Sequence, residues 1–200
     1  MTVSKSDVIC SNAYLSETEK QINATYIASY LMGCGWTLNA VSGILGNIER
    51  ESTVNPGLWE NFDEYDLEVG FGLVQWTPAS NLINWCNNNG YNYLDIDSQL
   101  RRILYELDNG LQYYATDEYP ESFYEFTKST KSPEYLAMAF LKNYERAGVS
   151  AEAERQQNAR KWYNFLNGNV TPETPDNPNK PISKSHKMSL ILMYQATRRR

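Results

Sequence analysis

Carboxylates are the side chains with which this sequence can carry out acid–base chemistry. The chain has 24 Asp and Glu residues, one histidine, His186, and three widely spaced cysteines, Cys10, Cys34 and Cys86. A single histidine near the C-terminus argues against Ser-His-Asp and Cys-His catalysis. The cysteines are odd in number and form no CxxC pair, so the sequence indicates neither a zinc site nor a disulfide framework. We therefore expect no metal and no cofactor, and chemistry that depends on carboxyl groups.

Two glutamates, Glu49 and Glu51, lie at the end of a segment with helical apolar periodicity. At about 100° per residue, Glu51 projects within about 20° of Ile44, and Glu49 about 40° from Leu45. A carboxyl group held against apolar neighbours has its charged form disfavoured and its pKa raised, which is what a general acid needs near neutral pH. Periodicity separates the two glutamates only weakly. The alternative is that both are solvated residues at a helix end.

Capping and periodicity signals predict six or so helices that would position these residues. Ser16 followed by Glu19 is typical of a capping box, which opens a helix over 17–32. The helix that carries Glu51 starts at Thr37. The other helices are expected after Thr77-Pro78 as far as about 86, from about 97 to 108, in one turn at 123–126, from 133 to 144, and over 151–166. With a short strand or hairpin over 70–76, the pattern indicates a mainly α (α+β) domain with one small β-hairpin.

Composition divides the chain into an N-terminal arm (1–14), a helical domain (15–168), a Pro-rich linker (169–183) and a short basic C-terminal tail (184–200). Residues 1–170 hold 12 Lys and Arg against 22 Asp and Glu, whereas 171–200 hold 6 against 2. An acidic domain argues against a nucleic-acid partner, although not against a neutral glycan. We also expect no membrane span and no signal peptide, because no apolar run is long enough for either.

Four segments resemble the phage tail lysozyme family when they are taken in order. They are Gly43 to Ile48 with Glu51-Ser52, then Asn55-Pro56-Gly57, then Gly70 to Ala79 (GFGLVQWTPA), and Asn143-Tyr144-Glu145-Arg146. The resemblance covers roughly residues 15–167. A more distant resemblance relates the chain to goose-type lysozymes and lytic transglycosylases. The family comprises peptidoglycan hydrolases at the tail tips of phages that infect Gram-positive bacteria, so the resemblance implies a lysozyme-like fold.

Carried over by position, the family's catalytic glutamate falls on Glu51, the Glu directly before the Ser, and not on Glu49. The resemblance also implies a set of cleft residues: Gln75, Trp76, Thr77 and Tyr144. In such a cleft an amide hydrogen-bonds an N-acetyl group or water, an indole lies against a sugar face, and a tyrosine forms the floor. The alternative for these residues is ordinary packing.

A glycosidase commonly needs a second carboxylate, and its separation from the first decides between inversion and retention. The loop after Glu51 offers Asp63, Glu64, Asp66 and Glu68. Asp63 is our candidate for the base or stabiliser, because relatives also tend to be acidic there. The alternatives are a merely solvated acidic loop, or assistance by the acetamido group of the substrate itself.

The expected function is therefore hydrolysis of the β-1,4 bond between N-acetylmuramic acid and N-acetylglucosamine, with Glu51 as general acid. Two alternatives remain: a lytic transglycosylase that forms an anhydro sugar, and a non-catalytic wall-binding or structural tail protein. The expected partners are peptidoglycan glycan strands and, through the basic tail, phage tail proteins. The resemblance implies a location at the virion tail tip, with action on the bacterial cell wall; prophage-encoded or conjugation-associated delivery is the alternative.

Overall fold

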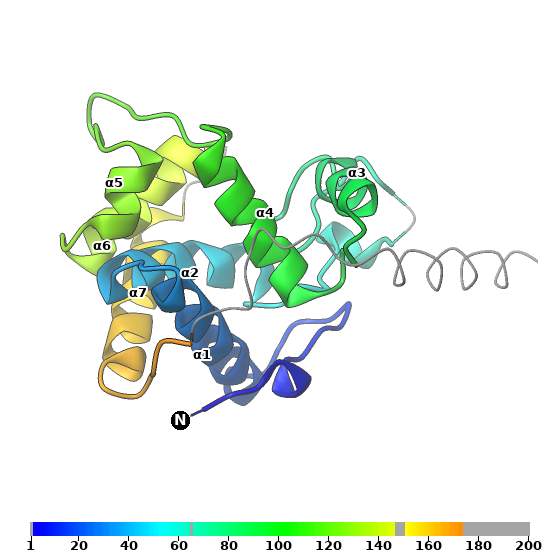
Figure 1. Ribbon diagram of the computed structural model, residues 1–200, viewed down its shortest axis with the longest axis horizontal. Helices are drawn as coiled ribbons and strands as arrows, with labels where there is room; N and C mark the ends of the chain where they lie inside the picture. The colour runs from blue at the N-terminus through cyan, green and yellow to red at the C-terminus, as the bar shows by residue number, and fades with distance from the viewer. Residues whose placement is uncertain (1, 65, 147–150, 174–200) are drawn as a thin grey trace, which may run out of the picture.

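The computed structural model describes residues 2–64, 66–146 and 151–173. These residues are mainly helical, which confirms the expected fold class (Figure 1). The α-helices are α1 (Glu17–Gly33), α2 (Leu38–Ser52), α3 (Ser80–Asn89), α4 (Ile96–Asp108), α5 (Phe123–Lys128), α6 (Pro133–Phe140) and α7 (Glu152–Leu166). Short helical turns are η1 (Lys5–Asp7), η2 (Glu60–Phe62) and the π-helical η3 (Leu141–Glu145). Within this described part, no helix combines the length and apolar character needed to cross a bilayer.

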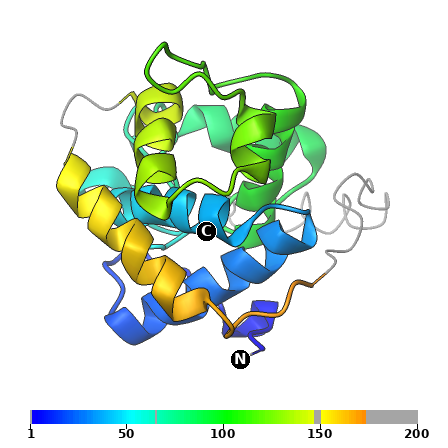
Figure 2. The ribbon, with the colours of Figure 1, turned by 90° about the vertical axis from the view of Figure 1, so that its left-hand side faces the viewer.

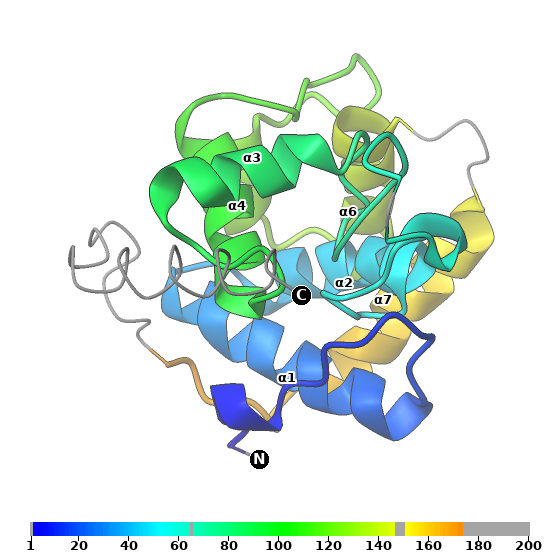
Figure 3. The ribbon, with the colours of Figure 1, turned by 90° about the vertical axis from the view of Figure 1, so that its right-hand side faces the viewer.

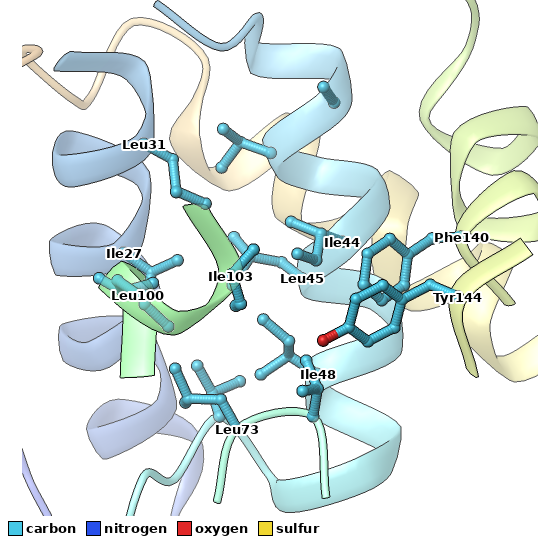
Figure 4. Packing of buried hydrophobic residues seen from close by; sticks show 14 of the residues in the cluster. Ile27, Leu31, Ile44, Leu45, Ile48, Leu73, Leu100, Ile103, Phe140 and Tyr144 are labelled. Atoms are coloured by element: carbon cyan, nitrogen blue, oxygen red, sulfur yellow. The ribbon is translucent and has the colours of Figure 1, made fainter. Parts of the chain in front are cut away.

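Helix α2 is the central element of the bundle and contacts α1, α5, α6 and α7. Figure 2 shows α1 and α7 on one side of α2, with α5 and α6 on the other. The apolar face predicted from periodicity is buried, and Ile44, Leu45 and Ile48 are fully inaccessible to solvent. In Figure 4 these side chains lie between Ile27 of α1 and Phe140 of α6. Burial of each such side chain contributes roughly 1.5–3 kcal/mol relative to exposure, so the helix that carries Glu51 is rigidly held.

Two glycines of α2 set how closely its neighbours approach. A Cβ added at Gly43 would lie 2.7 Å from Leu136 Cβ of α6, and one at Gly46 only 2.5 Å from the main-chain oxygen of Arg155 in α7. Both distances are shorter than real atoms tolerate. The absence of side chains at these positions therefore allows α6 and α7 to pack directly on α2, and it brings Arg155 close to the end of that helix.

The helix boundaries follow the predicted signals except where the chain turns sharply. Ser16 and Glu19 form the predicted capping box at the start of α1, with the Ser16 N–H donating to Glu19 Oε2 at 2.8 Å. Helix α3 begins at Ser80, two residues after the predicted start at Pro78. The helix predicted to run from Pro133 to Tyr144 ends at Phe140, and the chain continues as the wider turn η3. That turn places the residues of the NYER segment.

The predicted β-hairpin over 70–76 does not form strands. Phe71 makes only isolated antiparallel bridges, to Trp59 and to Trp76. The physical reason is backbone geometry: Gly72 and Gln75 adopt left-handed conformations, with φ of 82° and 48°, and turn the chain before an extended run can develop.

Buried polar side chains replace the missing strand hydrogen bonds. Gln99 of α4 accepts from the Leu73 N–H at 2.9 Å and donates to the Pro56 carbonyl at 2.7 Å. Ser52 donates to the Leu73 carbonyl at 2.9 Å from the last position of α2. Since buried main-chain groups need partners, these bonds fix the irregular segment against the end of α2.

The two ends of the described chain both lie near α1. The N-terminal arm runs beside the N-terminal half of α1, where Asn23 bonds the main chain of Ile9, and lies against the segment that follows α2 (Figure 3). At the other end, the Thr171 carbonyl accepts a hydrogen bond from Ser29 of α1 at 2.8 Å. The predicted linker from residue 174 onward and the predicted basic tail lie outside the described residues.

Candidate functional site

An open groove of ≈ 750 Å³ lies where the end of α2 meets the irregular segment, η3 and α7. Its lining brings together residues from seven parts of the chain. They are Tyr14, Lys20, Glu49, Arg50, Glu51, Thr53, Leu58, Trp59, Glu60, Asn61, Gln75, Thr77, Glu145, Glu154 and Asn158. Five of these are glutamates, against one lysine and one arginine, so the groove is acidic.

Glu51 lies in the last turn of α2, with its side chain 20% exposed. Its Oε1 accepts from Arg155 Nη2 at 2.5 Å, and Arg155 Nη1 donates to Asn47 Oδ1 at 2.9 Å. The Arg155 side chain is only 2% exposed, so a buried guanidinium reaches the groove from behind. The surroundings of Glu51 therefore differ from the apolar neighbours expected from periodicity, because a cation meets its carboxylate.

Glu145 is a second carboxyl group in the same groove, at the end of η3. Its Oε1 is buried and makes no hydrogen bond. Burial raises the pKa of Glu145 well above its usual range; the negative charge of Glu51 raises this pKa further, and Arg155 opposes the shift. Glu145 therefore keeps its proton at pH values where an ordinary glutamate has lost it.

Glu51 and Glu145 together form an unequal pair of carboxyl groups. Glu51 is ion-paired and partly exposed, whereas Glu145 has a buried Oε1 atom and a raised pKa. A carboxyl group with a raised pKa beside an ion-paired carboxylate is a common arrangement for acid–base chemistry. The site can thus hold a proton beside a negative charge at the wall of an open groove.

Glu49, two residues before Glu51, lies in a different environment. Its side chain is 8% exposed, and its Oε1 accepts from Lys20 Nζ at 3.1 Å and from Lys161 Nζ at 2.6 Å. Lys161 also reaches Glu17 of α1, at 3.2 Å. Glu49 is thus surrounded by two ammonium groups, and its ion pairs join α1, α2 and α7.

Gln75 and Thr77 line the groove with Glu51. The Gln75 side-chain amide donates to the Leu58 carbonyl at 3.1 Å and to the Gly72 carbonyl at 3.0 Å. Since its two N–H donors are used within the protein, Gln75 has its carbonyl oxygen to offer a ligand. Thr77 is exposed, and its hydroxyl donates to the main-chain carbonyl of Gln75 at 2.9 Å.

Trp76 and Tyr144 lie behind the groove and not in its lining. They are 6% and 1% exposed, and both bond the buried carboxylate of Glu106. Trp76 Nε1 donates to Glu106 Oε1 at 3.0 Å, and the Tyr144 hydroxyl donates to Oε2 at 2.5 Å. Tyr144 also stacks on Phe140, with ring centroids 4.3 Å apart. Each ring is fixed by packing and by its polar end, so neither presents a face to the groove.

Asp63, the predicted second carboxylate, is exposed directly after η2, and the lining of this groove does not include it. Glu60, Glu145 and Glu154 are the carboxyl groups that join Glu51 there from elsewhere in the chain. Sequence reasoning missed Glu145 as a site residue. The signal was present in the segment Asn143-Tyr144-Glu145-Arg146, from which only the tyrosine was predicted to be a cleft residue.

Two comparisons with known proteins bear on the family of the chain. The family described as phage tail lysozyme matches residues 22–166. The chain is also similar to Morphogenesis protein 1 of Bacillus phage B103, with 50% identity over 157 residues. That match covers 78% of this chain and 42% of the relative, so the chain spans less than half the length of the curated relative it matches.

Proposed function

Because the chain belongs to the phage tail lysozyme family, we propose that it hydrolyses the β-1,4 bond between N-acetylmuramic acid and N-acetylglucosamine in peptidoglycan. The observation that carries the proposal is the Glu51–Glu145 pair in the groove. One member holds a proton, and the other is a carboxylate that the solvent reaches. Cleavage of a glycosidic bond requires a proton donor to the leaving oxygen, and the pair can supply one.

Glu51 is the general acid in this proposal. Its side chain is 20% exposed, whereas the Oε1 atom of Glu145 is buried, so Glu51 is the member that meets the glycosidic oxygen. Glu145 acts through Glu51 as a positioning residue: the proton that it holds in the free protein must pass to Glu51 before Glu51 can donate it to the leaving oxygen. Arg155 limits the repulsion when both carboxyl groups are charged. Gln75 and Thr77 would hold the glycan, with the Gln75 carbonyl accepting from an N-acetyl N–H group.

A lytic transglycosylase is the second candidate, and one observation favours it. Asp63, the carboxylate expected to activate water, does not line the groove. In a transglycosylase Glu51 would serve as both acid and base, and the substrate's own 6-hydroxyl would replace water, giving an anhydro sugar. This reaction needs no second charged carboxylate.

We place this activity in a phage tail, acting on the wall of a Gram-positive host. The relative from Bacillus phage B103 is named a morphogenesis protein, which supports a role in the phage particle. The partners proposed are glycan strands in the groove and tail proteins at the C-terminal tail. We propose the boundaries 15–168 for the lysozyme-like unit.

Product analysis tests the reaction. Purified Gram-positive wall is digested with the chain and with Glu51→Gln, and the products are identified by mass spectrometry. Hydrolysis gives reducing N-acetylmuramic acid ends, which we expect from the unsubstituted chain and not from the variant. Anhydro ends would overturn the hydrolase in favour of the transglycosylase, and no release of glycan fragments by the unsubstituted chain would overturn both.

A further inference from the structure

Two aromatic rings meet on the surface where the N-terminal arm crosses the groove. Tyr14 is 69% exposed and Phe62 is 47% exposed, yet their ring centroids are 5.1 Å apart in an edge-to-face arrangement. Large apolar side chains that gather in solvent, outside the core, commonly mark a binding surface. Neither residue belongs to the main apolar core of the domain.

The chain holds this pair in place with a dedicated hydrogen-bond network. Asn12 accepts from the Trp59 N–H at 3.1 Å, and its amide donates to the Phe62 carbonyl at 3.0 Å. Asn55 donates to the Ser11 and Ala13 carbonyls, both at 2.6 Å. The residues directly before Tyr14 are therefore bound to the segment around η2, and this holds the backbone from which the Tyr14 ring projects.

Phe62 is exposed at a conformational cost. Asn61 and Phe62 have φ of 56° and 60°, in the left-handed region that bulky residues rarely adopt. Strain of this kind persists where the surroundings over-determine it, and it gathers at ligand sites. Here the strained turn directs an aromatic ring toward Tyr14 and not into the core.

The pair adjoins the groove through Tyr14. Tyr14, Trp59 and Asn61 line the same groove that holds Glu51, and Phe62, which directly follows Asn61, lies outside that lining and contacts Tyr14. An edge-to-face pair leaves one ring face open, and such a face fits the C–H surface of a pyranose ring. The neighbouring Asn61 can hydrogen-bond sugar hydroxyl or acetamido groups.

We propose that Tyr14 and Phe62 form a sugar-stacking subsite that binds one hexopyranose of the glycan strand on the arm side of the groove. The inference rests on the proposed function for its ligand, but it assigns new residues. Tyr14 precedes the residues matched by the family, 22–166. The subsite extends the glycan contact beyond the bond that is cut, so it acts on strand affinity and not on the chemical step.

Glycan binding without turnover tests the subsite. Soluble, peptide-free glycan strands are titrated into Glu51→Gln, and into the same chain with Tyr14→Ala, Phe62→Ala or Tyr14→Phe added. We expect Tyr14→Ala and Phe62→Ala each to weaken binding about tenfold, and Tyr14→Phe to leave it nearly unchanged because the ring remains. Tyr124→Ala is the matched control, since Tyr124 is 64% exposed and outside the lining of this groove. Unchanged melting temperatures establish that the variants fold.

The outcomes separate the subsite from the function. If the unsubstituted chain clears wall while Tyr14→Ala and Phe62→Ala bind strands as tightly as Tyr124→Ala, the subsite alone is overturned. If the unsubstituted chain neither clears wall nor binds strands, the proposed function is overturned and the subsite with it. Weaker binding in both alanine variants, with Tyr124→Ala unaffected, supports the subsite.

Discussion

The two sides of the end of α2 carry similar acids in opposite surroundings. On one side, Glu49 lies between two lysine ammonium groups. On the other, Glu51 and Glu145 lie together with Arg155, and one of these carboxyl groups keeps its proton. In the first region two ammonium groups, of Lys20 and Lys161, meet two carboxylates, of Glu49 and Glu17. In the second, a single buried guanidinium faces two carboxyl groups. The same residue type, two positions apart, thus gives a structural ion pair and a candidate site for proton transfer.

The ion-pair partners, and not the degree of burial, distinguish Glu49 from Glu51. Glu49 is less exposed than Glu51, at 8% against 20%, so burial alone does not single out Glu51. The carboxylate of Glu49 is held by two lysines, at 3.1 and 2.6 Å, as part of the ion pairs that join three helices. Periodicity from the sequence cannot make this distinction, because Lys161 and Arg155 both come from α7, more than 100 positions further along the chain.

The largest expected effect concerns Glu51, and its absence would contradict the difference in role between Glu49 and Glu51. We expect Glu51→Gln to lower the rate of wall lysis by about 10²–10⁴-fold, the usual contribution of general acid catalysis. Glu49→Gln serves as the matched control and should keep the rate within about threefold of the parent. Turbidity loss of Gram-positive walls measures both rates. Equal losses in the two variants would contradict the assignment of different roles.

Glu145→Gln should have the next largest effect, on the pH dependence. A carboxyl group whose pKa is raised in the folded state stabilises the fold at pH values below its unfolded pKa, about 4.3, and that stability is lost as the pH rises toward the folded value. The glutamine at position 145 in the variant cannot ionise, so the melting temperature of the variant should increase relative to that of the parent as the pH rises above about 4.3. We also expect the pH at which the lysis rate declines on the alkaline side to differ between the variant and the parent. If the pH profiles of stability and of lysis in the variant both run parallel to those of the parent, the role of Glu145 is refuted.

Glu49→Gln should act on stability and not on lysis. The substitution removes the charge from hydrogen bonds with two lysines at a nearly buried position, which should cost about 1–2 kcal/mol in the free energy of unfolding. Urea denaturation measures this loss. A stability equal to that of the parent would mean that the ion pairs of Glu49 do not hold α1, α2 and α7 together.

Lys161→Ala should have the smallest effect. Lys161 is 38% exposed, and solvent screens its pairs with Glu49 and Glu17. We therefore expect a loss below about 1 kcal/mol that shrinks further in high salt. Denaturation at low and high ionic strength checks both statements, and a loss as large as that of Glu49→Gln would show that Lys20 contributes little.

The helical part of the fold could be predicted because its signals are local. The capping box of Ser16 and Glu19 and the apolar spacing of α2 lie within a few residues of the structure that they specify. The irregular segment could not be predicted, because its hydrogen bonds come from far away. Gln99 reaches Pro56 and Leu73, so polar side chains replace the strand that the pattern around Gly70 suggested.

The candidate site was predicted in part for the same reason. Glu51, Gln75 and Thr77 do line one groove, and their catalytic and binding roles stay predictions. Trp76 and Tyr144 were expected in the cleft, but they bond Glu106, a partner that no local spacing indicates. Glu145 could not be predicted as a site residue from local spacing, because the π-helical turn η3, which places it in the groove with Glu51, has no local sequence signal.

Gly46 makes the geometry of the site depend on how closely α7 packs on α2. The contact that lets α7 rest on Gly46 also sets the reach of the Arg155 side chain toward Glu51. If α7 moved outward even slightly, the two carboxyl groups would lose their counterion while every helix stayed intact. We therefore expect mild heating or pressure to switch off lysis before circular dichroism registers any loss of helix.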